Sequence, residues 1–145
     1  MSEEGKRTRN ARPYEVLEMT IKEAVDNCRA KQPSQFADKQ LIAWLSVLDG
    51  QLFEYLKKHE KMTEREKAFD GYTEATPGDT VLLAETPCDD IYGYYLSMKL
   101  DYMLDEIDRY NVSASLFNEA EARYKRHIIQ TRRPKRAAKV NYRLL

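Results

Sequence analysis

The segment 87–128 constrains the fold most strongly, because it predicts two amphipathic helices joined by a very short link. Apolar residues recur at helical spacing on both sides of a break expected at Tyr110–Val112, and Asn111 or Ser113 would begin the second of the two helices. Helices joined by so few residues pack as an antiparallel hairpin. The segment therefore predicts an all-α fold.

A first helix is predicted from a capping box near the start of the sequence. Thr20 and Glu23 have the spacing at which each side chain accepts a hydrogen bond from the other residue's backbone N–H. The residues that follow place one apolar face at helical spacing: Ile21, Ala24, Val25 and Cys28. Pro33 is expected to end this helix, since proline excludes the preceding residue from the helical region.

A second helix should form the centre of the core, because a wide apolar stripe runs over residues 41–56. Asp38 is its expected N-cap. Gly50 interrupts the stripe, and a close contact with another helix is the expected reason. Residues 61–87 then lose helical periodicity and contain Asp-Gly and Pro-Gly turn signals, which predicts a long loop with a short strand at residues 80–84.

The 145 residues suffice for one domain with about four principal helices. We expect a flexible extension over residues 1–18, a helical domain over 19–131 and a basic arm over 132–145. No apolar run approaches the roughly 20 residues of a membrane span, and the first residues have no apolar core typical of a secretory signal. Two cysteines without a pairing pattern, Cys28 and Cys88, favour a reducing compartment.

Charge is unevenly distributed although the formal net charge is zero. Residues 59–108 hold thirteen acidic and four basic residues, a net of −9, whereas residues 123–145 hold nine basic residues and no acidic one. Such asymmetry within a chain points to partners, although a solvated basic arm is the simpler alternative. The basic residues of the expected arm are Arg132, Arg133, Lys135, Arg136, Lys139 and Arg143.

Two kinds of partner fit this basic arm. It could bind a phosphate backbone, which would make the chain a DNA-binding or regulatory helical module. It could equally bind an acidic neighbour, including the acidic region of an identical subunit. A head-to-tail contact of that kind produces a ring when its rotation closes.

Tyrosine is concentrated in the predicted hairpin, which holds six of the ten tyrosines in the chain. Tyrosine offers a large apolar area with a polar tip and is enriched in protein interfaces, although core packing must explain some of these residues. Three tyrosines within residues 92–95 cannot all face the same side of a helix. The candidate contacts with other subunits are Tyr92, Tyr94, Tyr95, Tyr102, Tyr110 and Phe117.

The sequence shows no pattern typical of an enzyme, and we expect neither a cofactor nor a metal. His59 and His127 lie in different predicted helices, without the further ligands that a zinc site needs. Asp101, Asp105 and Asp108 would share one face if a single helix held them, as in a magnesium or paired-carboxylate site. No base accompanies them, so a solvated or ion-paired face is the favoured interpretation and a metal-dependent enzyme is the alternative.

Three segments resemble a small family of proteins from tailed bacteriophages and prophages. The first is residues 19–56, with the motif WLSVLDG. The second is residues 69–111, with the motif LLAETPCDDIYGYYL and RYN at its end. The third is residues 115–127, which begin SLFN. The family is that of the head-to-tail connector, or adaptor, proteins of siphophage-like virions. Its members tend to begin near Met19, so residues 1–18 look like an extension.

The resemblance implies a helical, non-enzymatic virion protein with no catalytic residues. It implies a homo-oligomeric ring, expected to hold twelve subunits, in the neck of the virion. Such a ring binds the portal protein on one side and head-closure or tail proteins on the other, and packaged DNA passes through its lumen without sequence recognition. Before assembly the subunit would reside in the host cytoplasm, with no membrane involved.

Overall fold

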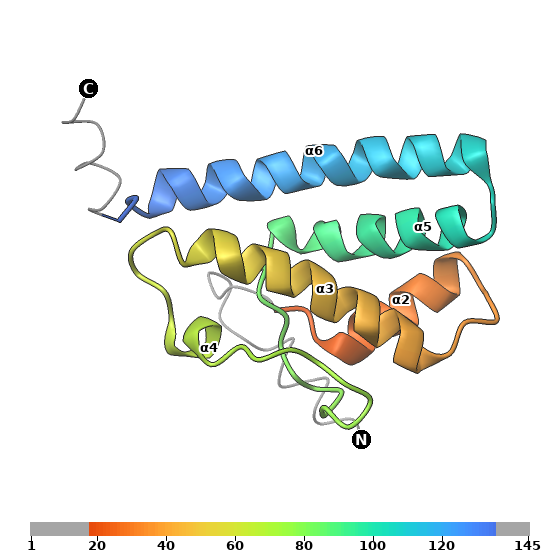
Figure 1. Cartoon of the computed structure of the whole chain (residues 1–145), viewed down its shortest axis with the longest axis horizontal. Coiled ribbons are helices and arrows are strands. Elements are labelled where there is room, and N and C mark those ends of the chain that lie inside the picture. The colour runs from red at the N-terminus through yellow and green to blue at the C-terminus, as the bar shows by residue number, and fades with distance from the viewer. Residues whose placement is uncertain (1–17, 136–145) are drawn as a thin grey trace, which may run out of the picture.

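The computed structural model describes residues 18–135, which form an all-α arrangement (Figure 1). The predicted fold class is confirmed, as are its four principal helices. The elements are α2 (Ile21–Lys31), α3 (Asp38–Leu56), α4 (Glu64–Lys67), the 3-10 helix η1 (Cys88–Asp90), α5 (Ile91–Met103) and α6 (Ile107–Thr131). Residues 1–17 of the predicted extension and residues 136–145 of the predicted arm lie outside the described residues.

Helix α2 begins as predicted. The Glu23 N–H donates to Thr20 Oγ1 at 3.2 Å, and the Thr20 N–H donates to Glu23 Oε1 at 3.1 Å, which completes the capping box. The helix ends at Lys31, two residues before Pro33. Its apolar face is buried as the spacing predicts: Ile21, Ala24, Val25 and Cys28.

Helix α3 lies at the centre of the core. Its leucines are almost completely buried: Leu41, Leu45, Leu48, Leu52 and Leu56. Two predictions about this helix are wrong. The N-cap is Ala37 rather than Asp38, because the Asp38 carboxylate accepts hydrogen bonds from the Arg29 guanidinium instead. No atom lies within 4 Å of a Cβ built on Gly50, so this glycine does not mark a close helix contact.

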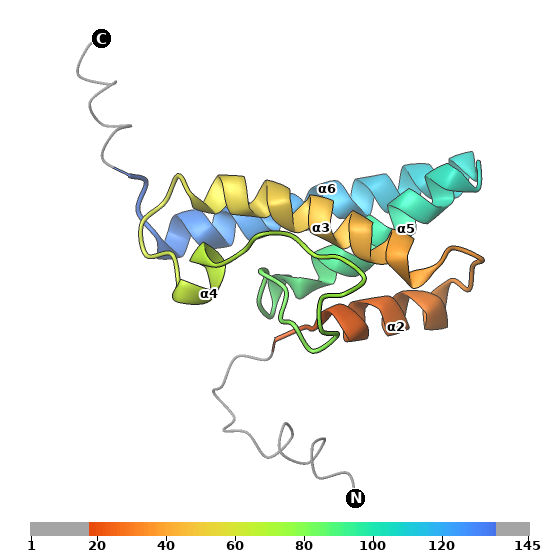
Figure 2. The same cartoon turned by 60° about the horizontal axis from the view of Figure 1, so that its bottom comes forward.

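Helices α5 and α6 form the predicted antiparallel hairpin (Figures 1 and 2). The break between them lies at residues 104–106 and not at Tyr110–Val112, so neither Asn111 nor Ser113 begins the second helix. Asp105 adopts a left-handed conformation with φ 60°. Its N–H donates to the Tyr102 carbonyl at 3.1 Å, and the Glu106 N–H donates to the Asp101 carbonyl at 2.9 Å. These two bonds form a Schellman motif, which satisfies the last carbonyls of α5.

The long segment between α3 and η1 is ordered against the bundle. It contains α4, whose Thr63 and Glu66 form a second capping box. The predicted strand does not form, because residues 18–135 offer this segment only one short partner. The Leu82 N–H donates to the Met19 carbonyl at 2.8 Å, and the Ile21 N–H donates to the Thr80 carbonyl at 3.0 Å, which gives an isolated bridge.

The chain leaves α6 at the end of the bundle opposite the α5–α6 connection (Figure 2). After α6 it pairs with residues that follow α3, since the Glu60 N–H donates to the Arg133 carbonyl at 2.8 Å and the Lys135 N–H donates to the Lys58 carbonyl at 3.0 Å. Within residues 18–135, no helix combines the length and apolar character that crossing a bilayer requires.

Candidate functional site

The α5–α6 connection carries a group of exposed apolar side chains. Tyr102, Met103 and Ile107 are 67%, 53% and 64% exposed, and the Tyr102 ring lies 5.8 Å from that of Tyr110, centroid to centroid. These four residues line a shallow groove of about 610 Å³ together with polar neighbours. We call them the tip patch. Apolar side chains gathered in this way, rather than scattered singly, are typical of protein–protein contacts.

The structure divides the six predicted contact residues into three groups. Tyr92, Tyr95 and Phe117 are at most 7% exposed and pack inside the chain, so they belong to its core and not to a surface. Tyr94 is half-buried against the core. Tyr102 and Tyr110 lie in the tip patch, and these two remain candidates for contact with another molecule.

The break predicted at Tyr110–Val112 would place Met103 and Ile107 within the first helix of the hairpin, so the sequence does not predict their exposure at a turn. Helix α5 ends at Met103, and the left-handed turn at Asp105 reverses the chain into α6, so both residues flank the turn. The sequence did hold one sign of this exposure. The apolar face of residues 91–107 is wider than packing on one side of a helix requires. A face of that width predicts a second contact beyond the core.

The three aspartates considered as a carboxylate cluster do not share a helix face. Asp101 is buried, and it accepts hydrogen bonds from Ser113 Oγ at 2.5 Å and Gln32 Nε2 at 2.8 Å. Asp105 lies in the turn and Asp108 in the first turn of α6, both exposed. Among residues 18–135 no group of three or more His, Cys, Asp or Glu side chains is placed to hold a metal ion.

The two histidines have different surroundings. His59 is buried after α3, where its Nδ1 lies 3.1 Å from the Tyr55 carbonyl. His127 lies exposed on α6.

A buried carboxylate that sequence reasoning did not single out joins three parts of the chain. Asp49 of α3 is fully buried, and its Oδ2 accepts from the Tyr72 hydroxyl at 2.6 Å and from the Leu83 N–H at 3.0 Å. Its Oδ1 accepts from the Tyr92 hydroxyl at 2.7 Å, and that hydroxyl accepts from the Ala84 N–H at 2.7 Å. We call these five residues the Asp49 cluster.

Burial dominates the electrostatics of this cluster. It raises the pKa of Asp49 to about 6, although the three donated hydrogen bonds and Arg65 lower it in part. The pKa values of Tyr72 and Tyr92 are raised by their own burial and by the Asp49 carboxylate, which keeps both hydroxyls protonated as donors. The signal in the sequence was the position of Asp49, four residues after Leu45 and three before Leu52, on the apolar stripe of α3.

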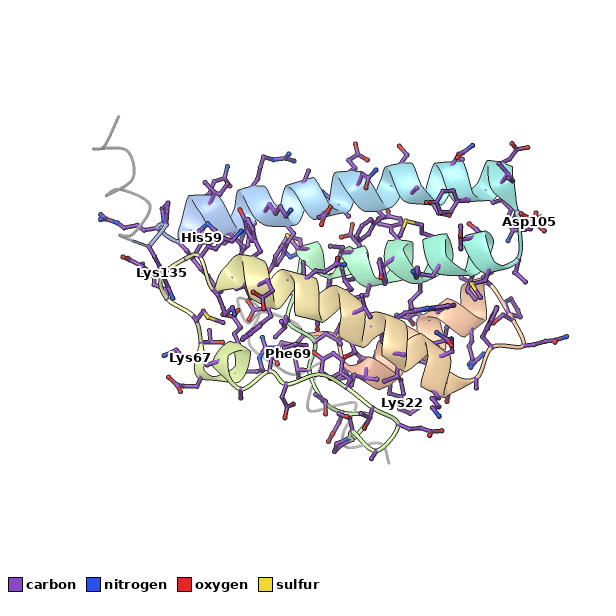
Figure 3. All side chains as sticks on the ribbon, viewed as in Figure 1. Lys22, His59, Lys67, Phe69, Asp105 and Lys135 are labelled. Atoms are coloured by element: carbon purple, nitrogen blue, oxygen red, sulfur yellow. The ribbon has the colours of Figure 1, made fainter. Side chains whose placement is uncertain are left out.

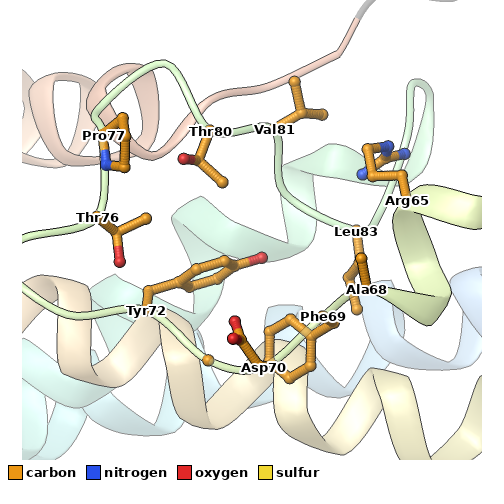
Figure 4. Close-up of a pocket in the computed structure, with 11 residues that line it drawn as sticks. Arg65, Ala68, Phe69, Asp70, Tyr72, Thr76, Pro77, Thr80, Val81 and Leu83 are labelled. Carbon is orange, nitrogen blue, oxygen red and sulfur yellow. The ribbon is translucent and has the colours of Figure 1, made fainter.

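A pocket of about 340 Å³ lies beside this cluster, lined by Arg65 of α4 and by the loop that follows α4 (Figure 4). Tyr72 is directed across it toward the Leu83 side, and Phe69 packs edge-on against the Tyr72 ring at 5.3 Å between centroids. Every polar atom of the Asp49 carboxylate already has a partner within the chain. The cluster therefore acts to fix the loop on the bundle.

The predicted basic arm begins with a residue that is used inside the fold. Arg132 forms a two-pronged ion pair with the buried Glu66 of α4, at 2.8 Å from Nη1 to Oε1 and 2.9 Å from Nη2 to Oε2. Burial raises the pKa of Glu66, but hydrogen bonds from Arg132 and Thr63 outweigh it and the net pKa is lowered. Assigning Arg132 to a free arm is therefore wrong.

Arg133 and Lys135 keep exposed side chains, as the prediction of a basic arm requires. Arg136, Lys139 and Arg143 lie outside the described residues.

Comparison with protein-family models, with curated proteins and with solved structures gave no match. The resemblance to phage connector proteins therefore remains a prediction from the sequence motifs.

Proposed function

We propose that this protein is a structural subunit that works by binding other proteins, and that its assembly is the head-to-tail connector of a tailed bacteriophage. The observation that carries the first part is the tip patch. Its side chains project from the α5–α6 hairpin. A Schellman motif forms the turn of this hairpin, and one face of α6 is buried against the rest of the chain. A rigid apolar surface of this kind reduces the entropy lost on association.

The phage assignment rests on the motifs quoted above. What supports it is that residues from two of those motifs lie together in the Asp49 cluster: Asp49 from WLSVLDG, and Leu83, Ala84 and Tyr92 from LLAETPCDDIYGYYL. Residues that fix a loop through a buried hydrogen-bond network identify a fold rather than a reaction. A resemblance to connector proteins at these positions therefore indicates a shared fold, as expected for a structural protein.

In the proposed role, copies of the chain form a ring beneath the portal and join it to head-closure or tail proteins around the DNA channel. Weak contacts between subunits suffice, because a portal that binds many copies holds them at high effective concentration. The tip patch and the exposed basic residues after α6 would supply contacts between proteins.

Analysis of the particles encoded by the same genome tests this function. Mass spectrometry of purified virions should detect the protein, and deletion of its gene should leave heads that carry no tails. Expression with the portal protein should yield a complex that co-purifies. Normal tailed particles after deletion, or virions without the protein, would exclude the proposal.

A further inference from the structure

The tip patch needs a partner that is apolar at its centre and basic at its edge. The apolar side chains of Tyr102, Met103, Ile107 and Tyr110 line the groove, and Asp105 and Glu106 line it with them. Asp108, one residue further, adds a third exposed carboxylate. The nearest base in the sequence, Arg109, lies 3.7 Å from the buried Asp101, which leaves the three exposed carboxylates in excess.

Residues 136–145 of the same chain have this chemistry. Their sequence RAAKVNYRLL contains three basic residues and no acidic side chain. Val140, Tyr142 and Leu144 alternate with polar residues, so an extended chain would present the three apolar side chains on one side. Charge and apolar content are thus both complementary to the tip patch.

The segment cannot lie along the tip patch of its own chain. Lys135 lies beside the residues that follow α3, at the end opposite Asp105 (Figure 3). Helix α6, with 25 residues, separates the two ends by about 37 Å. Ten fully extended residues span about 35 Å, and Val140, five residues beyond Lys135, reaches only about 18 Å.

We infer that residues 136–145 of one copy bind the tip patch of a second copy. The contact joins two different surfaces, so it is head-to-tail and extends to a ring when its rotation closes. The inference refines the ring contact in the proposed function and chooses an identical subunit, rather than DNA or the portal, as the partner of the basic segment.

Sedimentation velocity of the purified full chain, over a concentration series at low salt, tests the contact. The chain should associate, and salt should weaken the association because exposed charges contribute to it. Ile107→Ser should weaken association about tenfold, since it removes an apolar side chain from the centre of the patch. The matched control is Ile129→Ser, an equally exposed isoleucine at the other end of α6, which should leave association unchanged.

A charge exchange identifies the two surfaces. The tip variant Glu106→Lys/Asp108→Lys and the arm variant Arg136→Glu/Lys139→Glu/Arg143→Glu should each remain monomeric, since each places like charges against each other. A one-to-one mixture of the two should associate again, because every contact then joins opposite charges. Circular dichroism of each variant verifies that it is folded.

The inference is overturned by a wild-type chain that stays monomeric up to about 1 mM, by an association that Ile107→Ser leaves intact, or by a mixture that stays monomeric. Loss of binding to a short DNA duplex by the arm variant, with self-association intact, would likewise overturn it and identify a nucleic-acid arm. The experiment contains no portal or virion, so its failure leaves the connector proposal standing, and its success does not depend on that proposal.

Discussion

At the scale of single residues, the Asp49 cluster shows why the long loop is ordered. One carboxylate accepts three hydrogen bonds, two from tyrosines and one from the backbone of the loop. A buried acceptor whose hydrogen bonds are all made holds the donor groups in place, but removal of one donor leaves a desolvated group without a partner.

Tyr92→Phe should lower the free energy of unfolding by about 1–3 kcal/mol, because Asp49 Oδ1 and the Ala84 N–H both lose the Tyr92 hydroxyl. Urea denaturation measures the change. Tyr102→Phe removes an exposed hydroxyl from the same helix and should change the free energy by less than about 0.5 kcal/mol. Equal effects of the two substitutions would contradict the role of the cluster.

The pH dependence of stability should report Asp49. Its pKa is raised to about 6 in the folded chain, so between pH 4 and 6 the folded state keeps a proton that the unfolded state releases. The stability that Asp49 contributes is therefore present at low pH and is lost as pH rises to about 6, a decline of about 3 kcal/mol.

Asp49→Asn isolates this decline because asparagine does not titrate. The free energy of unfolding of the wild type minus that of the variant should fall from pH 4 to pH 6 and then stay level. The ion pair of Glu66 is present in both proteins and cancels in this difference. A difference that rises over the same range would show that the pKa of Asp49 is lowered instead.

At the scale of elements, two glycines offer opposite tests of helix and loop. Gly50→Ala should stabilise the protein by about 0.5–1 kcal/mol, because α3 gains a better helix former and a Cβ meets nothing within 4 Å. Gly71→Ala should destabilise by about 1–2 kcal/mol, since Gly71 has φ 95° and its Cβ would lie 3.3 Å from Ser46 Oγ. Thermal melts of both variants measure the two signs, and destabilisation by Gly50→Ala would reveal a constraint on α3 beyond packing.

The ion pair between Arg132 and Glu66 of α4 gives Arg132 a structural role that the neighbouring Arg133 lacks. Arg132→Met should cost about 3 kcal/mol, because it leaves the Glu66 carboxylate buried without its partner. Arg133→Met, at the adjacent exposed position, should stay within about 0.5 kcal/mol of the wild type. Chemical denaturation at neutral pH measures the free energy of unfolding of both variants. Equal losses would show that Arg132 has no structural role and belongs to the basic arm as predicted.

The helices were predictable from sequence where a local pattern specifies them. The capping box at Thr20, the apolar stripe of α3 and the stop before Pro33 each depend on near neighbours. The end of α5 was not predictable in this way, because it depends on the left-handed conformation of Asp105, a residue that adopts it less readily than glycine. The apolar residues on both sides of that turn have helical spacing, which hid the break.

The site was less predictable than the helices. Burial of Tyr92, Tyr95 and Phe117 is decided by how α5 packs on α3 and α6, and exposure of Tyr102 by where α5 ends. The partner of Arg132 lies 66 residues away in the sequence, so no local pattern identifies the pair. The buried cluster had one indication in the sequence, which is that Asp49 falls on the apolar stripe of α3.

At the scale of the whole molecule, the hairpin gives the chain two chemically different ends. Exposed apolar side chains and carboxylates lie at the α5–α6 turn, and exposed bases follow α6 at the other end (Figure 3). A molecule with complementary ends favours repeated association in one direction over closed pairing. That polarity supports the head-to-tail contact inferred between copies of the chain.

We propose that this chain forms the ring between portal and tail. Cryo-electron microscopy of the neck in intact particles encoded by the same genome tests it most directly. We expect a ring of copies beneath the portal, into which the bundle of α3, α5 and α6 fits with its hairpin turn against a neighbouring protein. A neck that is fully accounted for by other chains, with this protein absent from the particle, would contradict it.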